Sequence, residues 1–134
     1  MHMKFYKCEV CGNQFEVLKD GGSTPVCCGK SMTELKSCST DGAVEKHVPV
    51  YCVDEKENCP GDYHKIRIEV GSQPHPMDES HYIEWIILET DCKIYAKSLC
   101  PEKKPHAVFC IKKTETVKGV YAYCNLHGLW EAKI

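Results

Sequence analysis

The sequence predicts a mostly β chain in which a small metal-stabilised domain precedes an antiparallel β-sandwich. Two pairs of cysteines lie within the first 30 residues, in a segment too short to build a sufficient core of its own. After residue 44, short strand-like segments follow one another at roughly ten-residue spacing, which is typical of antiparallel sandwiches. No segment shows the long apolar repeat of an amphipathic helix.

Length and charge narrow the possible functions. The chain of 134 residues fits a small domain joined to a larger one. Its formal net charge of −2 argues against a broad basic surface for nucleic acids. No apolar run approaches the ~20 residues that cross a bilayer, and the first residues lack the apolar core of a secretion signal. We therefore expect a cytoplasmic protein.

The cysteine content favours metal binding. The chain has 11 cysteines, which at this length indicate either a disulfide framework or a set of metal ligands. Their number is odd and no secretion signal is present, so we favour metal ligands in a reducing compartment.

The first domain, residues 1–36, is predicted to hold one metal with four cysteines. These are Cys8, Cys11, Cys27 and Cys28. Neighbouring side chains of a strand point to opposite faces, so two adjacent cysteines reach one metal only if the backbone turns, which Gly29 permits. A tetrahedral four-thiolate site suits iron or zinc, and the spacing leaves both open. We expect this metal to supply much of the domain's stability.

Local patterns complete the first domain. Phe15, Val17 and Leu18 predict a short apolar strand, and the glycine-rich segment 20–23 predicts a turn. Residues 37–43 are small and polar, and we interpret them as a linker that opens the second domain, residues 37–134.

The second domain is predicted to consist of strands. Ile66, Ile68 and Val70 alternate with charged residues, which indicates a half-buried strand. Residues 47–51 are predicted to start a strand, and residues 82–89 are apolar enough for a central one. The other predicted strands are 93–99, 107–112, 119–124 and 129–132.

Four histidines and one cysteine suggest a second metal site in this domain. Cys124 and His127 can reach one metal from a single tight turn at Gly128. Its upstream partners would be His47, His75 and His81. Five ligands exceed the four of structural zinc. Imidazole suits iron, a thiolate pushes electron density onto it, and a sixth position would stay open for a small oxygen species.

Two charged residues precede His47, and each candidate ligand also has a simpler interpretation. Lys46, beside His47, would attract an anion locally, and Glu45 precedes it. Taken singly, each histidine is more simply a surface or hydrogen-bonded residue, and Cys124 a small buried apolar one. Taken together, the spacings favour a common metal.

Three motifs resemble the desulfoferrodoxin family, the two-iron class of superoxide reductases. They are residues 45–49, residues 75–86 and residues 124–130. The four cysteines of the first domain resemble the desulforedoxin-like amino-terminal domain of that family, so the resemblance spans nearly the whole chain. It implies an immunoglobulin-like β-sandwich that carries the catalytic iron, a homodimer, and iron rather than zinc at the four-cysteine site.

The resemblance also implies roles. The residues that match the ligands of the catalytic iron are His47, His75, His81 and His127 as equatorial nitrogens and Cys124 as the axial thiolate. In the family, ferrous iron gives one electron to superoxide, two protons release hydrogen peroxide, and an external donor, often rubredoxin, re-reduces the iron. The lysine that matches Lys46 draws in superoxide and helps order proton-donating water, and the glutamate that matches Glu45 caps the oxidised iron.

Two other functions stay open at this point. The chain would be a non-catalytic electron carrier if both irons only exchanged electrons. It would be a structural zinc protein if the second site were vestigial.

The remaining cysteines and histidines carry weaker expectations. Five cysteines are expected to be free thiols: Cys38, Cys52, Cys59, Cys92 and Cys100. The alternatives are a Cys52–Cys59 disulfide or a third metal shared by Cys52, Cys59, Cys92 and Cys100. Cys110 is predicted to be a core residue, and His64 and His106 ordinary surface or hydrogen-bonded histidines.

Overall fold

The computed structural model describes residues 3–38, 44–54 and 59–132, with the exception of the Glu45 side chain. The chain divides into two compact units, Met1–Lys36 and Ser37–Ile134, and each is described here by itself. Within the described residues, no helix is long and apolar enough to cross a membrane.

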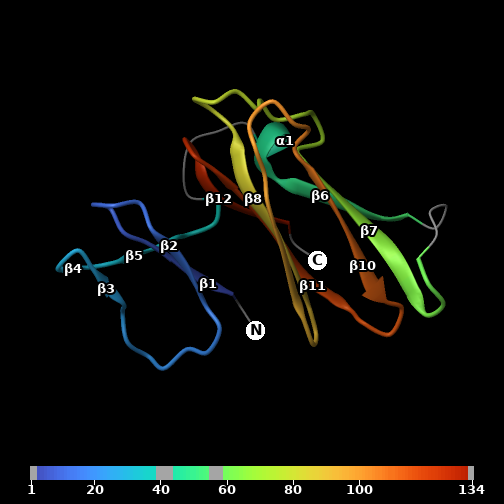
Figure 1. The fold of residues 1–134 in the computed structure, drawn as a ribbon, viewed down its shortest axis with the longest axis horizontal. Coiled ribbons are helices and arrows are strands. Elements are labelled where there is room, and N and C mark those ends of the chain that lie inside the picture. Colours follow the sequence, from blue (N-terminus) through green and yellow to red (C-terminus); the bar gives the residue numbers. More distant parts are fainter. Residues whose placement is uncertain (1–2, 39–43, 55–58, 133–134) are drawn as a thin grey trace. The chain divides into compact units, whose positions relative to one another are not determined.

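The first unit is built from five short strands (Figure 1). They are β1 (Lys4–Lys7), β2 (Gln14–Val17), β3 (Val26–Cys27), β4 (Lys30–Ser31) and β5 (Thr33–Glu34). Strand β1 lies at the centre of an antiparallel sheet of order β2-β1-β5, and β3 and β4 form a separate antiparallel pair. The strand predicted around Phe15 is β2, but it ends at Val17, and Leu18 is exposed.

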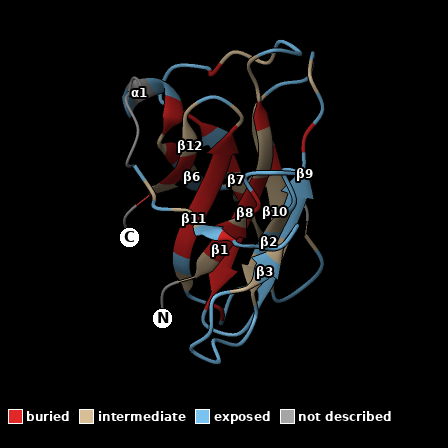
Figure 2. Ribbon diagram, turned by 90° about the vertical axis from the view of Figure 1, so that its left-hand side faces the viewer, coloured by how far each residue is buried: buried red, intermediate tan, exposed pale blue. Residues whose placement is uncertain are grey.

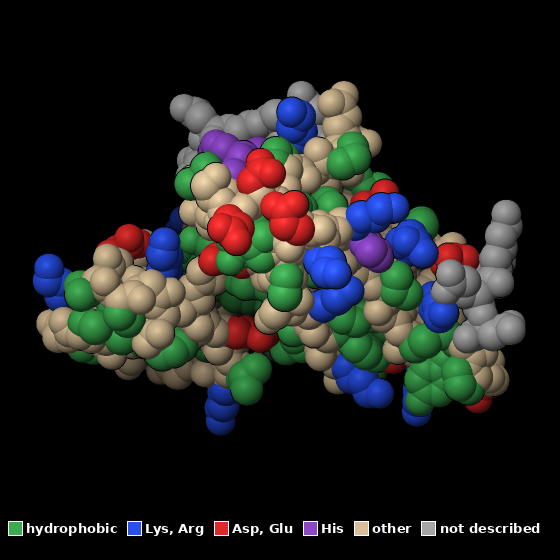
Figure 3. Space-filling model, turned by 45° about the horizontal axis from the view of Figure 1, so that its top comes forward, with side chains coloured by type: hydrophobic (Ala, Val, Ile, Leu, Met, Phe, Trp, Pro, Cys, Tyr) green, Lys and Arg blue, Asp and Glu red, His purple; other side chains and the backbone are tan. Residues whose placement is uncertain are grey.

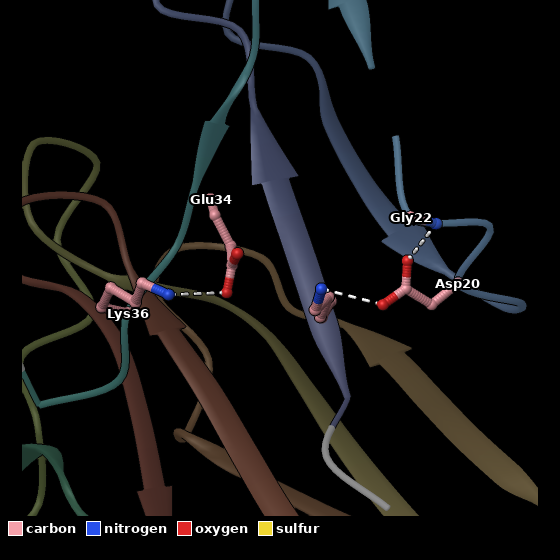
Figure 4. A network of polar contacts seen from close by, with 5 residues as sticks. Asp20, Gly22, Glu34 and Lys36 are labelled. Carbon is pink, nitrogen blue, oxygen red and sulfur yellow. Dashed lines mark hydrogen bonds and ion pairs between the residues drawn. The ribbon is translucent and has the colours of Figure 1, made fainter. Parts of the chain in front are cut away.

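The interior of the first unit is small. Tyr6, Cys8 and Met32 form its buried cluster, and Val17 and Cys27 pack against it in part. On the surface, Asp20 accepts a hydrogen bond from the Gly22 N–H at 2.8 Å and pairs with Lys4 at 2.8 Å, and Lys36 pairs with Glu34 at 2.8 Å (Figure 4). Such exposed ion pairs contribute about 0–1 kcal/mol each, so they do not replace a core.

The second unit is an antiparallel β-sandwich of the immunoglobulin-like class (Figure 1). It opens with one turn of helix, α1 (Val44–His47). Its strands are β6 (Pro49–Asp54), β7 (Tyr63–Val70), β8 (Ile83–Thr90), β9 (Ile94–Ser98), β10 (His106–Lys112), β11 (Val117–Cys124) and β12 (Gly128–Ala132). One sheet has the order β10-β7-β6 and the other β12-β11-β8-β9, and every neighbouring pair is antiparallel.

The core of the sandwich follows from the alternation along its strands. Ile66, Ile68 and Val70 of β7 are at most 1 % exposed and pack with Ile86 and Leu88 of β8 in one buried cluster. Figure 2 shows buried residues running along β8 and β11. The segment predicted as a central strand, residues 82–89, is indeed interior to its sheet as β8.

Strand β11 carries one irregularity that matters for the site. Tyr123 pairs with Trp85, whereas Cys124 pairs with Ile83, so the register shifts between these two residues. Such an irregularity leaves one residue of the neighbouring strand without a direct partner. Cys124 ends β11 with its side chain fully buried.

Three sequence predictions are wrong. His47 ends helix α1 rather than starting a strand, because the following strand begins only at Pro49. Cys110 is not a core residue: Ala107 and Ile111 take the inward positions of β10, so Cys110 points outward and forms a disulfide with Cys59. Cys59 is therefore not the free thiol that the sequence predicted, because the fold places it beside Cys110. The pairing also overturns the Cys52–Cys59 disulfide and the third metal site. The other four cysteines expected to be free are exposed thiols: Cys38, Cys52, Cys92 and Cys100.

Candidate metal centres

The first centre brings four thiol groups together in the amino-terminal unit. The sulfur atoms of Cys8, Cys11, Cys27 and Cys28 all lie within 4.8 Å of one another. The Sγ atoms of Cys11 and Cys27 are 3.6 Å apart, and those of Cys27 and Cys28 are 4.0 Å apart. Cys8 is buried, whereas Cys11 and Cys28 are exposed, so this centre lies at the surface of its unit.

Two backbone turns make this arrangement possible. In the first, the Gly12 N–H donates to the Cys8 carbonyl at 2.9 Å, and the Cys11 N–H points to the Cys8 sulfur at 3.5 Å. In the second, Cys28 and Gly29 both have positive φ, at 53° and 73°. This left-handed turn is what lets two adjacent cysteines face the same point.

The acidities of these thiols indicate that the group suits a cation. The N–H of Cys11 holds the pKa of the Cys8 thiol at about 6, against burial and with help from the Val10 N–H. The neighbouring thiols of Cys11 and Cys8 raise the pKa of Cys28 to about 12 and that of Cys27 above its usual value. Four thiolates this close repel one another, and a bound metal removes that penalty. The donor set fits iron, and its chemistry alone fits zinc as well.

The second centre lies at one end of the sandwich and draws on three separate segments. His47 ends α1, His75 and His81 lie between β7 and β8, and Cys124 and His127 flank the turn from β11 to β12. Their ligand atoms all lie within 4.8 Å of one another. The structure therefore brings together all five residues that the sequence singled out here.

The four imidazole rings surround a common centre. Neighbouring rings lie at steep angles to one another, with centroid distances of 4.6 Å for His47–His75, 4.7 Å for His75–His81, 5.1 Å for His81–His127 and 4.7 Å for His127–His47. Across this ring, His47 and His81 are 6.4 Å apart and tilted by only 31°. Four rings arranged in this way direct nitrogen atoms to one point.

The nitrogen atoms of the four rings lie close enough together to share one cation. His47 Nε2 lies 3.1 Å from His75 Nε2 and 3.0 Å from His127 Nδ1. The His75 Nδ1–H donates to the Pro76 carbonyl at 2.6 Å, which leaves the lone pair on Nε2, as a metal ligand requires. His81 Nε2 is buried and has no hydrogen-bond partner in the described part of the chain. A metal bound to these atoms would satisfy all of them, so the donor set fits one.

Burial favours the neutral form of two of these imidazoles, His75 and His81. Burial lowers the pKa of His75 to about 4, the Pro76 carbonyl acts in the opposite direction, and the other three rings add to the lowering. Burial also lowers the pKa of His81, as do the charges of His127 and Lys46.

Cys124 completes the group from below the surface. Its side chain is fully buried, and its Sγ lies 3.7 Å from His127 Nδ1. Burial raises the pKa of this thiol, while the N–H groups of Leu126 and His127 act against that rise. A cation at the centre would favour the thiolate.

Two further residues position the ligands, and only Asn125 had no predicted role. Asn125 joins two ligand-bearing segments: its Oδ1 accepts from the Tyr82 N–H at 2.9 Å, its N–H donates to the Tyr82 carbonyl at 3.1 Å, and its Nδ2 donates to the Ser80 carbonyl at 3.1 Å. Trp130 stacks on His47 at 4.8 Å and donates from Nε1 to the His127 carbonyl at 3.1 Å. The sequence offers a signal for the role of Asn125, because the side chain of an asparagine in a tight turn often forms hydrogen bonds like those of the backbone.

The predicted charged residues lie beside the second centre in the chain. Lys46 is exposed on α1 and precedes His47. Glu45 belongs to the same helix, but its side chain lies outside the described residues. Figure 3 shows histidine side chains gathered at one place on the surface, with Asp and Glu side chains beside them.

Comparisons with known proteins agree on one family. A sequence model described as desulfoferrodoxin matches residues 39–133, and a model of the desulfoferrodoxin N-terminal domain matches residues 1–35. A desulfoferrodoxin of Nitratidesulfovibrio vulgaris is 47% identical over 130 residues, which cover 97% of this chain and 95% of the relative. A superoxide reductase of Pyrococcus horikoshii is 34% identical over 110 residues, which cover 72% and 91%.

A solved structure is also similar. The superoxide reductase from Treponema pallidum superposes with a TM-score of 0.79 at 29% identity, covering 99% of this chain and 100% of that one.

Proposed function

The chain belongs to the desulfoferrodoxin family, and on that premise we propose that it is a superoxide reductase, which reduces superoxide by one electron to hydrogen peroxide. The observation that carries the proposal is the ring of four imidazoles with one buried thiol, a larger set than structural zinc uses. The two donor groups are consistent with the two iron sites of the family.

We assign the ligands accordingly. Cys8, Cys11, Cys27 and Cys28 would hold the first iron, and His47, His75, His81, His127 and Cys124 the second, catalytic iron. When bound, the second iron supplies the electron. Superoxide, one electron and two protons give hydrogen peroxide.

The protein's own groups would prepare this site for the reaction. The Pro76 carbonyl fixes the His75 ring with Nε2 directed inward. Asn125 and Trp130 hold the turn that carries Cys124 and His127. The Leu126 and His127 N–H groups favour the ionised form of the buried Cys124 thiol. Protons would come from solvent, because His81 and His127 are only partly buried.

Lys46 would act on the association of superoxide. Its charge reaches the site, since it contributes to the lowered pKa of His81. Lys46→Gln should slow the bimolecular step by about tenfold at low salt and flatten its salt dependence. Lys118→Gln is the matched control, because Lys118 is an exposed lysine six residues from Cys124 on β11, about 20 Å away. Equal rates and salt slopes for Lys46→Gln and the unchanged protein would remove this role. Glu45 is proposed to cap the oxidised iron.

Metal analysis combined with pulsed superoxide decay tests the main proposal. The unchanged protein should contain two irons per chain and consume superoxide, and His75→Ala should stop consuming it while the visible absorption of the four-cysteine iron remains. Superoxide decay that is as fast in His75→Ala would refute the assignment. Iron without superoxide consumption would instead identify a non-catalytic two-iron electron-transfer protein, and a colourless protein a zinc one.

The remaining proposals concern the setting of the enzyme. We propose residues 1–36 as the first-iron domain, residues 37–134 as the catalytic domain, a homodimer, and an external electron donor such as rubredoxin. We also propose a cytoplasmic location, which the nine cysteines outside a disulfide support. Sedimentation equilibrium tests the dimer, and the rate at which reduced rubredoxin re-reduces the catalytic iron tests the donor.

A further inference from the structure

The disulfide between Cys59 and Cys110 differs from every other cysteine of the chain in its oxidation state. Nine cysteines are outside a disulfide, and four of them form the first metal centre, where only reduced sulfur can bind a metal. The free thiols therefore indicate a reducing environment. Disulfides that occur in such an environment are usually transient and serve catalysis or redox sensing. One bonded pair beside nine thiols thus points to a disulfide that opens and closes.

This disulfide lies on the outer surface of the sandwich. Strand β10 turns Ala107 and Ile111 into the core and leaves Cys110 exposed, and Cys59 is only partly buried. Neither of the two cysteines belongs to the core of 13 buried residues, so the sandwich keeps its interior when the bond opens. Exposed disulfides are also the ones that thiols reduce most readily.

Backbone hydrogen bonds hold the two cysteine-bearing segments together independently of the sulfur atoms. The Lys113 N–H donates to the Asp62 carbonyl at 2.7 Å, which ties the segment after Cys59 to the end of β10. The Tyr63 N–H donates to the Pro60 carbonyl at 3.0 Å and fixes a turn beside it. The Cα atoms of the two cysteines are 6.5 Å apart, within the range from which a disulfide forms. The two sulfur atoms therefore stay within reach of each other after reduction.

The charges beside Cys110 favour a thiolate, which is the form of cysteine that attacks peroxides. Alternate residues of a strand share one face, so Lys112 lies next to Cys110 on the outer face of the sheet. Across the strands, the direct partner of Cys110 is Lys65 of β7. Two cations therefore adjoin this sulfur atom.

Cys52 is an exposed thiol on the same outer face and provides the comparison. Its neighbour two positions along β6 is Asp54, and its partner across the strands is Arg67. These two opposite charges pair with each other at 3.9 Å, so their effects on Cys52 offset one another. We therefore expect Cys52 to be the less reactive of the two exposed positions.

We propose that Cys59 and Cys110 are a thiol pair that reduces hydrogen peroxide. The Cys110 thiolate attacks one peroxide oxygen and breaks the O–O bond, so that Cys110 becomes a sulfenic acid and the departing hydroxide takes up a proton to form water. The Cys59 thiol then attacks that sulfur, the disulfide forms, and the sulfenic oxygen leaves as a second water. Two thiols and one peroxide thus give one disulfide and two waters. A thiol reductant, such as glutathione or a dithiol protein, reopens the disulfide.

The supply of peroxide rests on the proposed function, because hydrogen peroxide is the product of superoxide reduction. The chemistry of the thiol pair does not involve the catalytic iron. Peroxide is therefore added directly in the experiment, which makes the reaction of the pair measurable whether or not the protein consumes superoxide.

Alkylation and peptide mass spectrometry of the iron-loaded full chain follow each cysteine separately. Reduced glutathione should open the disulfide while circular dichroism shows an unchanged fold. After glutathione is removed, one equivalent of hydrogen peroxide should close the disulfide about tenfold or more faster than it oxidises Cys52. In Cys59→Ser, the same treatment should leave Cys110 as a sulfenic acid that dimedone traps. Cys52→Ser is the matched control and should close the disulfide at the unchanged rate.

His75→Ala keeps the two readouts apart. This variant should close the disulfide with added peroxide as fast as the unchanged protein does. A failed superoxide assay counts against the catalytic iron alone, and a disulfide that does not close counts against the thiol pair alone. The proposal is overturned if glutathione leaves the disulfide intact, if peroxide oxidises Cys52 as fast as the pair, or if the disulfide does not close in His75→Ala.

Discussion

The two metal centres are built on opposite principles. The first gathers its ligands from two tight turns in a unit whose buried cluster consists of Tyr6, Cys8 and Met32, one of which is itself a ligand. The second gathers its ligands at the end of a sandwich with a continuous core of 13 buried residues. A metal at the first centre therefore acts as part of the core, whereas a metal at the second occupies a place that the fold has already prepared.

The ligands also differ in their readiness to bind. At the first centre, Cys28 has its pKa raised to about 12 by neighbouring thiols, so metal binding must displace protons. At the second, burial lowers the pKa of His75 to about 4, so its ring is neutral at pH 7. Metal binding must therefore displace protons from Cys27 and Cys28 at the first centre. At the second it must displace one from Cys124, whose pKa burial also raises, but none from His75.

Refolding the chain without metal should give the largest difference between the two units. The amides of residues 1–36 should lose their protection from hydrogen exchange, because that unit has too little apolar interior to fold alone. The amides of β7, β8 and β11 should stay protected. Protection of both units, or of neither, would contradict the contrast, and restoring iron should restore the first unit.

Cys27→Ser tests whether the second centre works without the first. This change should abolish the visible absorption of the first centre and the protection of residues 1–36, since a hydroxyl is a poor ligand at a four-thiolate site. Superoxide consumption by the second unit should continue at its usual rate in a pulsed-decay measurement. A parallel loss of that activity would mean that the sandwich site depends on the first centre.

Asparagines beside the two centres offer a matched pair. Asn125→Ala removes the side-chain hydrogen bonds to Tyr82 and Ser80 and should lower the iron affinity of the second centre by about 10–100-fold. Asn13→Ala removes only a long contact of 3.8 Å from Nδ2 to the Cys27 sulfur in an exposed position, and should change iron affinity little. Competition with a chelator of known affinity measures both. Equal losses of iron affinity in the two variants would show that the second centre gains nothing from the side-chain hydrogen bonds of Asn125.

The smallest predicted effect concerns Glu115, a residue of the sandwich that has no part in the metal centre. Glu115 is buried and accepts hydrogen bonds from Thr90 Oγ1 at 2.7 Å, Tyr95 OH at 3.0 Å and the Lys112 N–H at 2.8 Å. Glu115→Gln turns an NH₂ group toward these donors and should lower the free energy of unfolding by about 1–3 kcal/mol. Urea denaturation followed by tryptophan fluorescence measures this.

The pH dependence of this difference follows from the same contacts. Burial raises the pKa of Glu115, but its hydrogen bonds with Thr90, Lys112 and Tyr95 outweigh that effect, and the pKa lies below its usual 4.5. The unfolded chain therefore takes up the proton first, so the contribution of this carboxylate is complete above pH 4.5 and is lost as the pH falls below it. The difference between the unchanged protein and Glu115→Gln should shrink in that range. A difference independent of pH would exclude the ionised carboxylate as its cause.

Period-two alternation made the sandwich predictable. The strand around Ile66 and Ile68 is β7, and residues 107–112 and 119–124 fall within β10 and β11. Strands of two residues, such as β3 and β4, are too short to show any period. The single turn of α1 is also too short to leave an apolar repeat, so His47 was placed in a strand.

The residues of the sites were likewise only partly predictable from the sequence. Residue type and spacing singled out the five residues of the second centre, and the motif resemblance supported them. Spacing alone does not bring His47 and His127 together, because that depends on how separate segments pack. The outward position of Cys110 was available from alternation, but its bond to Cys59 depends on the tertiary fold. The hydrogen bonds of Asn125 likewise connect residues more than 40 positions apart.

The register shift at the end of β11 limits how this protein can be redesigned. Inserting or deleting one residue anywhere between Gly119 and Tyr123 would turn Cys124 to the opposite side of the sheet while leaving most backbone pairing possible. Such a variant would lack its sulfur ligand, and the buried side chains between the change and Cys124 would exchange faces, which also weakens the packing of β11. Length is thus a fixed quantity in this strand, and a library that varies loop lengths should leave β11 untouched.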